Sequence, residues 1–129
     1  MQSVKAVDHW LPTPASQQHA AALRQEAVRL AKDLAELGAE LVLLFGSVVR
    51  NAVGETSDLD LLVVLATERR FVERSVWLAE VLQPTVPVDF LVYTPAEFAR
   101  LRHWPFIRTA LTEGQVLHPM EVPEAEGRS

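Results

Sequence analysis

The stretch LVLLFGSVVRNAVGETSDLDLLVVL, residues Leu41 to Leu65, decides the fold of this chain. Its two ends, Leu41–Phe45 and Leu59–Leu65, are apolar runs short enough to be strands buried on both faces. The polar connection GSVVRNAVGETSD lies between them. We therefore expect two buried strands of one sheet, joined by this polar connection.

Helix and strand patterns continue on both sides of this stretch. Upstream, apolar residues recur at three- and four-residue spacing from Ala20 to Leu37, which predicts a helix with Ser16 as its N-cap and Gly38 as its stop. Downstream, the pattern predicts a helix over Glu68–Leu82, a strand over about Val86–Tyr93, a helix from Pro95, another over Phe106–Gly114, and a last strand at Val116 and Leu117. This order of elements predicts an α/β (α+β) fold with a single mixed sheet covered by helices.

Length and composition favour one globular domain. The chain has 129 residues, of which 49% are hydrophobic and 22% charged, as in ordinary globular proteins. We divide it into an N-terminal arm over 1–15, whose Trp10 and Leu11 are expected to pack on the domain, a domain over 16–118, and a loose C-terminal tail over 119–129. The absence of cysteine and of an apolar run of about 18 residues makes the cytoplasm the expected location, without a membrane partner.

The charge balance limits the class of partner. Seventeen acidic and twelve basic side chains give a net charge of −5, which argues against a broad grip on a long nucleic acid. The basic clusters within 69–74 and 100–108 are expected to lie on solvated helix faces. Trp104 and Phe106, on either side of Pro105, are expected to form a packed helix corner, with a partner-facing patch as the alternative.

Three aspartates form the candidate catalytic and metal-binding set. Asp58 and Asp60 flank Leu59, and the period of two along a strand places both carboxylates on one face. Two like charges at one place favour a cation, and magnesium prefers such oxygen ligands. Asp89 interrupts the third apolar strand, and it lies beside the pair if Glu68–Leu82 is a crossover between parallel strands. Three carboxylates are enough to hold two metal ions.

Gly46 and Ser47 form the candidate phosphate-binding turn. Glycine lets a phosphate approach the backbone, and the short helix expected over VVRNA would add free N–H groups. If the first two strands are antiparallel, this turn lies beside Asp58 and Asp60. Arg50 would then offset phosphate charge as a further cofactor-binding residue, although a solvated position is the alternative.

A Gly-Ser pair, ten intervening residues, the triplet DLD and an aspartate in the third strand form a pattern that resembles the DNA polymerase beta-like nucleotidyltransferase superfamily, in particular its minimal nucleotidyltransferase domains. The resemblance covers roughly Leu37 to Thr94 and is weaker through EGQVLH near the end. It implies that Gly46 and Ser47 bind the triphosphate of ATP or another nucleoside triphosphate and that the three aspartates bind Mg²⁺. The chain departs from many relatives at Val48 and Val49, where small or basic residues are common.

The resemblance also implies a reaction and a partner. Larger relatives, which modify antibiotics or nucleic acids, carry a further domain that binds the acceptor. The minimal family resembles antitoxins encoded with an all-helical HEPN toxin, and some of these antitoxins transfer AMP to a toxin tyrosine. We therefore expect transfer of AMP, or another nucleoside monophosphate, to a hydroxyl on a partner protein. Two alternatives stay open: a binding module that neutralises its partner by contact, and a free-standing enzyme that acts on a small molecule.

Overall fold

The computed structural model describes residues 13–50, 53–54 and 57–119, and its centre is a four-stranded sheet in the order β3-β2-β1-β4. The strands are β1 (Leu41–Phe45), β2 (Leu59–Val64), β3 (Val88–Tyr93) and β4 (Gln115–His118). β1 pairs with β2 and β4 in antiparallel sense, whereas β2 and β3 are parallel. The predicted mixed sheet is therefore confirmed, and the two strand orientations on which the candidate site was conditional are both present.

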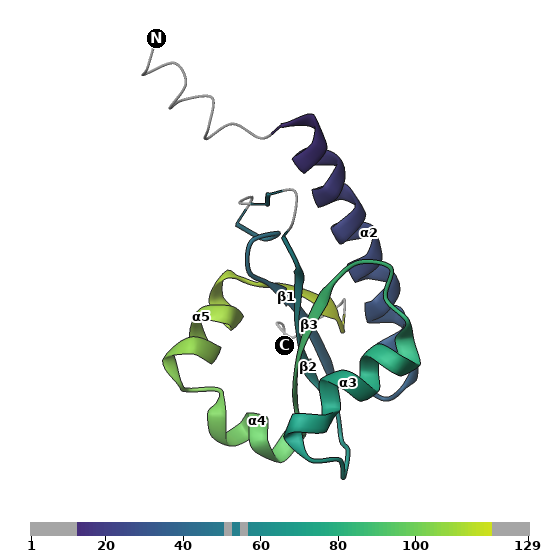
Figure 1. Cartoon of the computed structure of the whole chain (residues 1–129). Helices are drawn as coiled ribbons and strands as arrows, with labels where there is room; N and C mark the ends of the chain where they lie inside the picture. The colour runs from purple at the N-terminus through teal and green to yellow at the C-terminus, as the bar shows by residue number, and fades with distance from the viewer. Residues whose placement is uncertain (1–12, 51–52, 55–56, 120–129) are drawn as a thin grey trace.

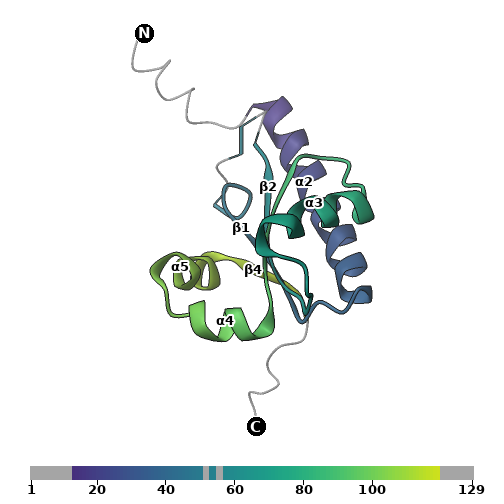
Figure 2. The same cartoon turned by 60° about the horizontal axis from the view of Figure 1, so that its bottom comes forward.

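Helices cover both faces of the sheet (Figure 1). α2 (Pro14–Glu36) and α3 (Phe71–Leu82) pack on one face, and α4 (Pro95–Leu101) and α5 (Pro105–Glu113) pack on the other, as Figure 2 shows from a second side. α3 is the crossover between the parallel strands β2 and β3. No helix in the described ranges combines the length and the apolar character that a membrane span requires.

Alternation along the strands divides the core in two. Leu59, Leu61 and Val63 of β2 belong to the large apolar cluster under α2 and α3, whereas Leu62 and Val64 pack with α4 and α5. Successive side chains of a strand point to opposite faces. Polar residues that alternate in step with Leu62 and Val64 therefore face the α4 and α5 side of the sheet.

The N-terminus of α2 differs from the predicted one. Thr13, not Ser16, is the N-cap: its hydroxyl accepts from the Ser16 backbone N–H at 3.0 Å, while the Ser16 hydroxyl accepts from the Thr13 N–H at 2.9 Å. Pro14 occupies the first turn, where its missing N–H leaves no hydrogen bond broken. Ser16 is the N3 residue of the capping box that Thr13 begins, so the predicted N-cap lies three residues too late. Trp10 and Leu11 of the predicted arm lie outside the described residues.

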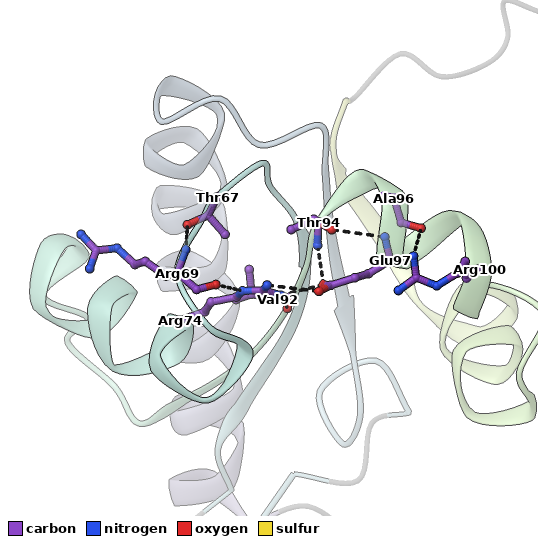
Figure 3. A network of polar contacts seen from close by, with 8 residues as sticks. All are labelled: Thr67, Arg69, Arg74, Val92, Thr94, Ala96, Glu97 and Arg100. Carbon is purple, nitrogen blue, oxygen red and sulfur yellow. Dashed lines mark hydrogen bonds and ion pairs between the residues drawn. The ribbon is translucent and has the colours of Figure 1, made fainter.

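The basic cluster within 69–74 was expected to lie on a solvated helix face, and for Arg74 this prediction is wrong. Its side chain is buried, with the residue only 5% exposed. The guanidinium donates to both carboxylate oxygens of Glu97, at 2.6 and 3.1 Å, and to the backbone carbonyl oxygens of Val92 and Arg69 (Figure 3). Glu97 is also the capping-box residue of α4, where its carboxylate accepts from the Thr94 N–H. This buried pair fastens α3, β3 and α4 to one another.

Candidate active site

The site begins where the end of β1 touches the start of β2. Phe45 is the register partner of Asp60, so Gly46 follows directly beside that carboxylate. A Cβ added to Gly46 would lie 2.2 Å from Asp60 Oδ2, closer than real Cβ atoms approach any atom. Gly46 also has a φ of 85°, in the left-handed region that side chains disfavour. Both steric constraints require glycine here, and they place bare backbone against a carboxylate.

Asp89 lies next to Asp60 across the parallel strands. The two residues are direct register partners, and neighbouring strands run about 4.8 Å apart. Asp60 is half-buried and Asp89 is exposed, so the pair lies at the rim of the face covered by α4 and α5. Burial raises the pKa of the Asp60 carboxyl, and the charges of Asp89 and Asp58 raise it further, while Arg50 opposes the rise.

Asp58 precedes β2 and is exposed. Its charge reaches Asp60, but within the described residues no three acidic or histidine side chains already lie close enough together to form a metal site. The structure therefore joins Asp60 to Asp89 directly and leaves Asp58 beside them. Binding of a metal by all three carboxylates stays a prediction.

The donor set nevertheless fits a hard divalent cation. The three side chains offer oxygen ligands alone, which magnesium prefers. Among the described residues, none of the three carboxylates accepts a hydrogen bond or forms an ion pair. Burial raises the pKa of Asp60 most and the neighbouring carboxylates of Asp89 and Asp58 add to the rise, so a bound cation would favour the ionised form of this carboxyl.

In the described residues the Gly-Ser pair begins a single turn, and Asn51 and Ala52 of the predicted VVRNA helix lie outside the described residues. The Arg50 N–H donates to the Gly46 carbonyl oxygen at 3.2 Å, and residues 47–50 are turn residues. Ser47 is half-buried. Val48 is 1% exposed and belongs to the apolar cluster under α2. The burial of Val48 in this cluster thus explains why an apolar residue stands where many relatives have a small or basic one.

Arg50 lies between the turn and α5. Its exposed guanidinium is 3.9 Å from the Glu113 carboxylate, which is a loose ion pair at the surface. A small cavity of about 60 Å³ opens beside it, and its walls include Gly46, Phe45 and Phe106. Arg50 is therefore at the edge of the candidate site, free enough to turn towards a phosphate.

Trp104 and Phe106 are more exposed than a packed helix corner would make them. Trp104 is 61% and Phe106 57% exposed. Phe106 packs edge-on against Phe45, with ring centroids 5.9 Å apart. Phe106 thus forms a wall of the small cavity beside Gly46.

Three side chains of α2 contact the backbone around the site, and sequence reasoning assigned none of them that place. His19 Nε2 lies 2.8 Å from the Ser57 carbonyl oxygen, and Arg24 Nη2 donates to the Val48 carbonyl oxygen at 2.8 Å. Glu26 accepts from the Thr85 N–H at 2.8 Å, ahead of β3. These contacts join residues 24 to 59 positions apart, so no local pattern marks them.

Two comparisons with known proteins concern the family and the fold of this chain. The family model described as "nucleotidyltransferase domain" matches residues 27–117. The crystal structure of a putative nucleotidyltransferase from Sulfolobus solfataricus aligns with a TM-score of 0.57 at 19% sequence identity, covering 81% of this chain and 86% of that one. At that identity the structural likeness is one of fold. A comparison with curated proteins gave no match.

Proposed function

We propose, from the premise that this chain belongs to the nucleotidyltransferase domain family, that it is a magnesium-dependent enzyme which transfers AMP from ATP to a hydroxyl on a partner protein. Nucleotidyl transfer is the activity of the family. The metal, the choice of ATP and the protein acceptor are the proposal's own additions.

The observation that carries the proposal is the contact between Gly46 and Asp60. Bare backbone at the end of β1 lies against a carboxylate at the start of β2, with no room for a Cβ between them. A triphosphate held on the turn would therefore lie next to the acids. The register partner Asp89 adds a second carboxylate at the same place.

Each residue has a distinct task in the proposed reaction. Gly46 and Ser47 would bind the triphosphate, through backbone approach and a hydroxyl donor. Asp58, Asp60 and Asp89 would hold magnesium, which neutralises phosphate charge and makes a nearby hydroxyl easier to deprotonate. Asp89 is the most suitable of the three to accept the hydroxyl proton, because it is exposed at the outer side of the pair. The hydroxyl oxygen would bond to the α-phosphorus of ATP while the bond between that phosphorus and the β-phosphate oxygen breaks, so that pyrophosphate leaves in line. Catalysis then depends on positioning and charge, without a covalent enzyme intermediate.

The acceptor is proposed to lie on another protein. The described residues form one sheet with its covering helices, and they contain no second domain that could bind an acceptor. We propose a helical toxin of the HEPN type, with tyrosine as the modified residue. Asp89 at the rim of this face and the aromatic side chain of Phe106 on α5 are both exposed, so such a partner could reach them.

Intact-mass spectrometry tests the proposal. The protein is incubated with ATP, Mg²⁺ and the product of the neighbouring reading frame, and both proteins are weighed. We expect one or more AMP additions on the partner, lost with Asp60→Asn and kept with the matched control Asp33→Asn. Asp33 lies on α2 and pairs with Arg29.

Two outcomes would favour the alternatives. If Asp60→Asn fully neutralises the partner and the wild-type mixture shows no mass change, the protein acts as a binding module. If small hydroxyl compounds gain AMP and no protein does, the protein is a free-standing small-molecule enzyme.

A further inference from the structure

The N-terminal half of α2 contacts both ends of the segment between β1 and β2, and Figure 1 shows the helix beside that segment. We propose that Arg24 and His19 are positioning residues, which hold the Gly46–Ser47 turn and Asp58 at the separation that ATP and magnesium need. This inference rests on the proposed function and deepens it. It names residues that prepare the site before a ligand binds.

Arg24 holds the end that carries the phosphate-binding turn. Its guanidinium donates to the carbonyl oxygen of Val48, the residue directly after Ser47, at 2.8 Å. The Val48 side chain is buried in the apolar cluster under α2 at the same time. One residue is thus held by its side chain and by its carbonyl group. The orientation of the Gly46–Ser47 turn ahead of it follows from these two anchors.

His19 holds the end that carries Asp58. Its Nε2 lies 2.8 Å from the carbonyl oxygen of Ser57, the residue directly before Asp58, and it donates there in the tautomer that carries the proton on Nε2. On the other side of Asp58, the Leu59 N–H donates to the Pro87 carbonyl oxygen at 2.9 Å. Peptide groups on both sides of Asp58 are therefore fixed, one from α2 and one from the residue before β3.

Such anchors matter because the segment has no regular structure of its own in its described parts. Residues 46–50, 53–54, 57 and 58 belong to no helix or strand. A ligand that has to order flexible backbone binds more weakly, since the lost conformational entropy opposes binding. Two hydrogen bonds from a rigid helix fix both ends of the segment in advance. The carboxylate and the phosphate-binding turn then need little movement when a ligand arrives.

Substitution of Arg24 or His19 should affect the stability of the fold less than it affects ligand binding. Arg24 is exposed and His19 is half-exposed, whereas α2 is held to the sheet by fully buried residues such as Leu23, Leu30 and Leu34. Loss of either polar contact leaves that apolar face intact. A positioning role therefore predicts weaker ligand binding with an unchanged melting temperature, and a purely structural role predicts the reverse.

Calorimetry on four variants tests the contribution of Arg24 to ATP binding and that of His19 to Mg²⁺ binding separately. Arg24→Met and His19→Leu remove the donors while keeping bulk, and Arg24→Lys and His19→Gln keep a donor. We expect Arg24→Met to raise the Kd for ATP at saturating Mg²⁺ about fivefold, and His19→Leu to raise the Mg²⁺ concentration for half-maximal ATP binding about fivefold, each the equivalent of one ordinary hydrogen bond. The donor-keeping variants should retain most of the wild-type affinity. Arg100→Met and His103→Leu are matched controls in the α4 region, where both residues are exposed.

The outcomes separate this inference from the proposed function. ATP and Mg²⁺ binding by Arg24→Met and His19→Leu equal to that of the controls would overturn the inference and leave the function standing. A fall in melting temperature that accounts for the weaker binding, or no recovery in the donor-keeping variants, would overturn the inference as well. Absence of Mg²⁺-dependent ATP binding in the wild-type protein would overturn the proposed function and the inference together.

Discussion

Replacing Gly46 by alanine tests the contact between the phosphate-binding turn and Asp60. The added Cβ would lie 2.2 Å from Asp60 Oδ2 and 3.0 Å from its Cγ. The carboxylate oxygen has to retreat by about 0.8 Å to reach the 3.0 Å limit of real Cβ contacts. Functional groups tolerate misplacement of only about 0.5 Å, and an error near 1 Å can lower activity about 100-fold. We expect ATP binding with Mg²⁺ to weaken by roughly ten- to hundredfold on these grounds.

Gly38→Ala is the matched control, because it separates backbone strain from steric overlap. Gly38 also has a positive φ, 105°, but nothing lies within 4 Å of a Cβ added there. Both substitutions should lower the free energy of unfolding by about 1 to 2 kcal/mol through the left-handed backbone. That loss corresponds to about 5 °C in melting temperature for each kcal/mol. Only Gly46→Ala should also move Asp60.

Calorimetric titration of ATP at saturating Mg²⁺, together with thermal unfolding, compares the two variants. We expect similar melting temperatures and a loss of ATP affinity confined to Gly46→Ala. Equal ATP affinity in Gly46→Ala and Gly38→Ala would refute the idea that bare backbone beside Asp60 forms the phosphate site.

Three further predictions follow from individual side chains. Ser47→Ala removes one hydroxyl donor and should weaken ATP binding by about 1 to 3 kcal/mol in calorimetry, so an unchanged affinity would mean that Ser47 is only part of a turn. Asp60→Asn should raise the melting temperature in Mg²⁺-free buffer at pH 7, because burial and two neighbouring carboxylates raise the pKa of Asp60; a lower melting temperature would contradict that electrostatic account. The carboxyls of Glu26 and Glu97 have pKa values lowered from 4.5 to about 2, chiefly by hydrogen bonds from Arg29 and Arg74 respectively. Their stabilisation is therefore complete above pH 4.5 and is lost as the pH falls through about 2, by as much as about 3 kcal/mol each. Urea unfolding at pH 5 and pH 2.5 checks this, and Glu97→Gln should remove part of the difference.

The strand pattern was sufficient to predict most of the sheet. Leu41–Phe45 is a strand with the predicted bounds, and the second strand ends at Val64, one residue earlier than predicted. The apolar runs were informative because both strands are buried on both faces, so each run is continuous. β3 begins at Val88, not Val86, because Pro87 lacks an N–H and contributes only its carbonyl oxygen to β2.

The sequence predicted the neighbours of Asp60 better than it predicted the rest of the site. The approach of Gly46 and Asp89 to Asp60 was conditional on an antiparallel β1–β2 pair and a parallel β2–β3 pair, and both pairs are present. The contacts of His19 and Arg24 were beyond prediction, since each depends on the rotation of α2 on the sheet. The buried pair of Arg74 and Glu97 has the same cause, because residues 23 positions apart on different helices carry no shared pattern.

The exposed side of α5 is a second feature that the sequence did not predict. Trp104 and Phe106 are large aromatic residues of the kind expected in a core. Both are nevertheless largely exposed, because Ile107 and Ala110 form the buried side of the helix. A helix of nine residues gives a short periodic pattern, in which the aromatic and aliphatic faces are hard to tell apart. The structure thus supplies the orientation that the sequence lacked.

The most direct measurement of the central claim is magnesium-dependent binding of ATP by isothermal titration calorimetry. The wild-type protein and Asp33→Asn should bind ATP with Mg²⁺ and lose that binding when EDTA removes the metal. Asp58→Asn combined with Asp60→Asn should keep the far-ultraviolet circular dichroism of the wild type and lose ATP binding or show it greatly weakened. Unchanged ATP affinity in this folded double variant would contradict the assignment of the site to Gly46, Asp58, Asp60 and Asp89.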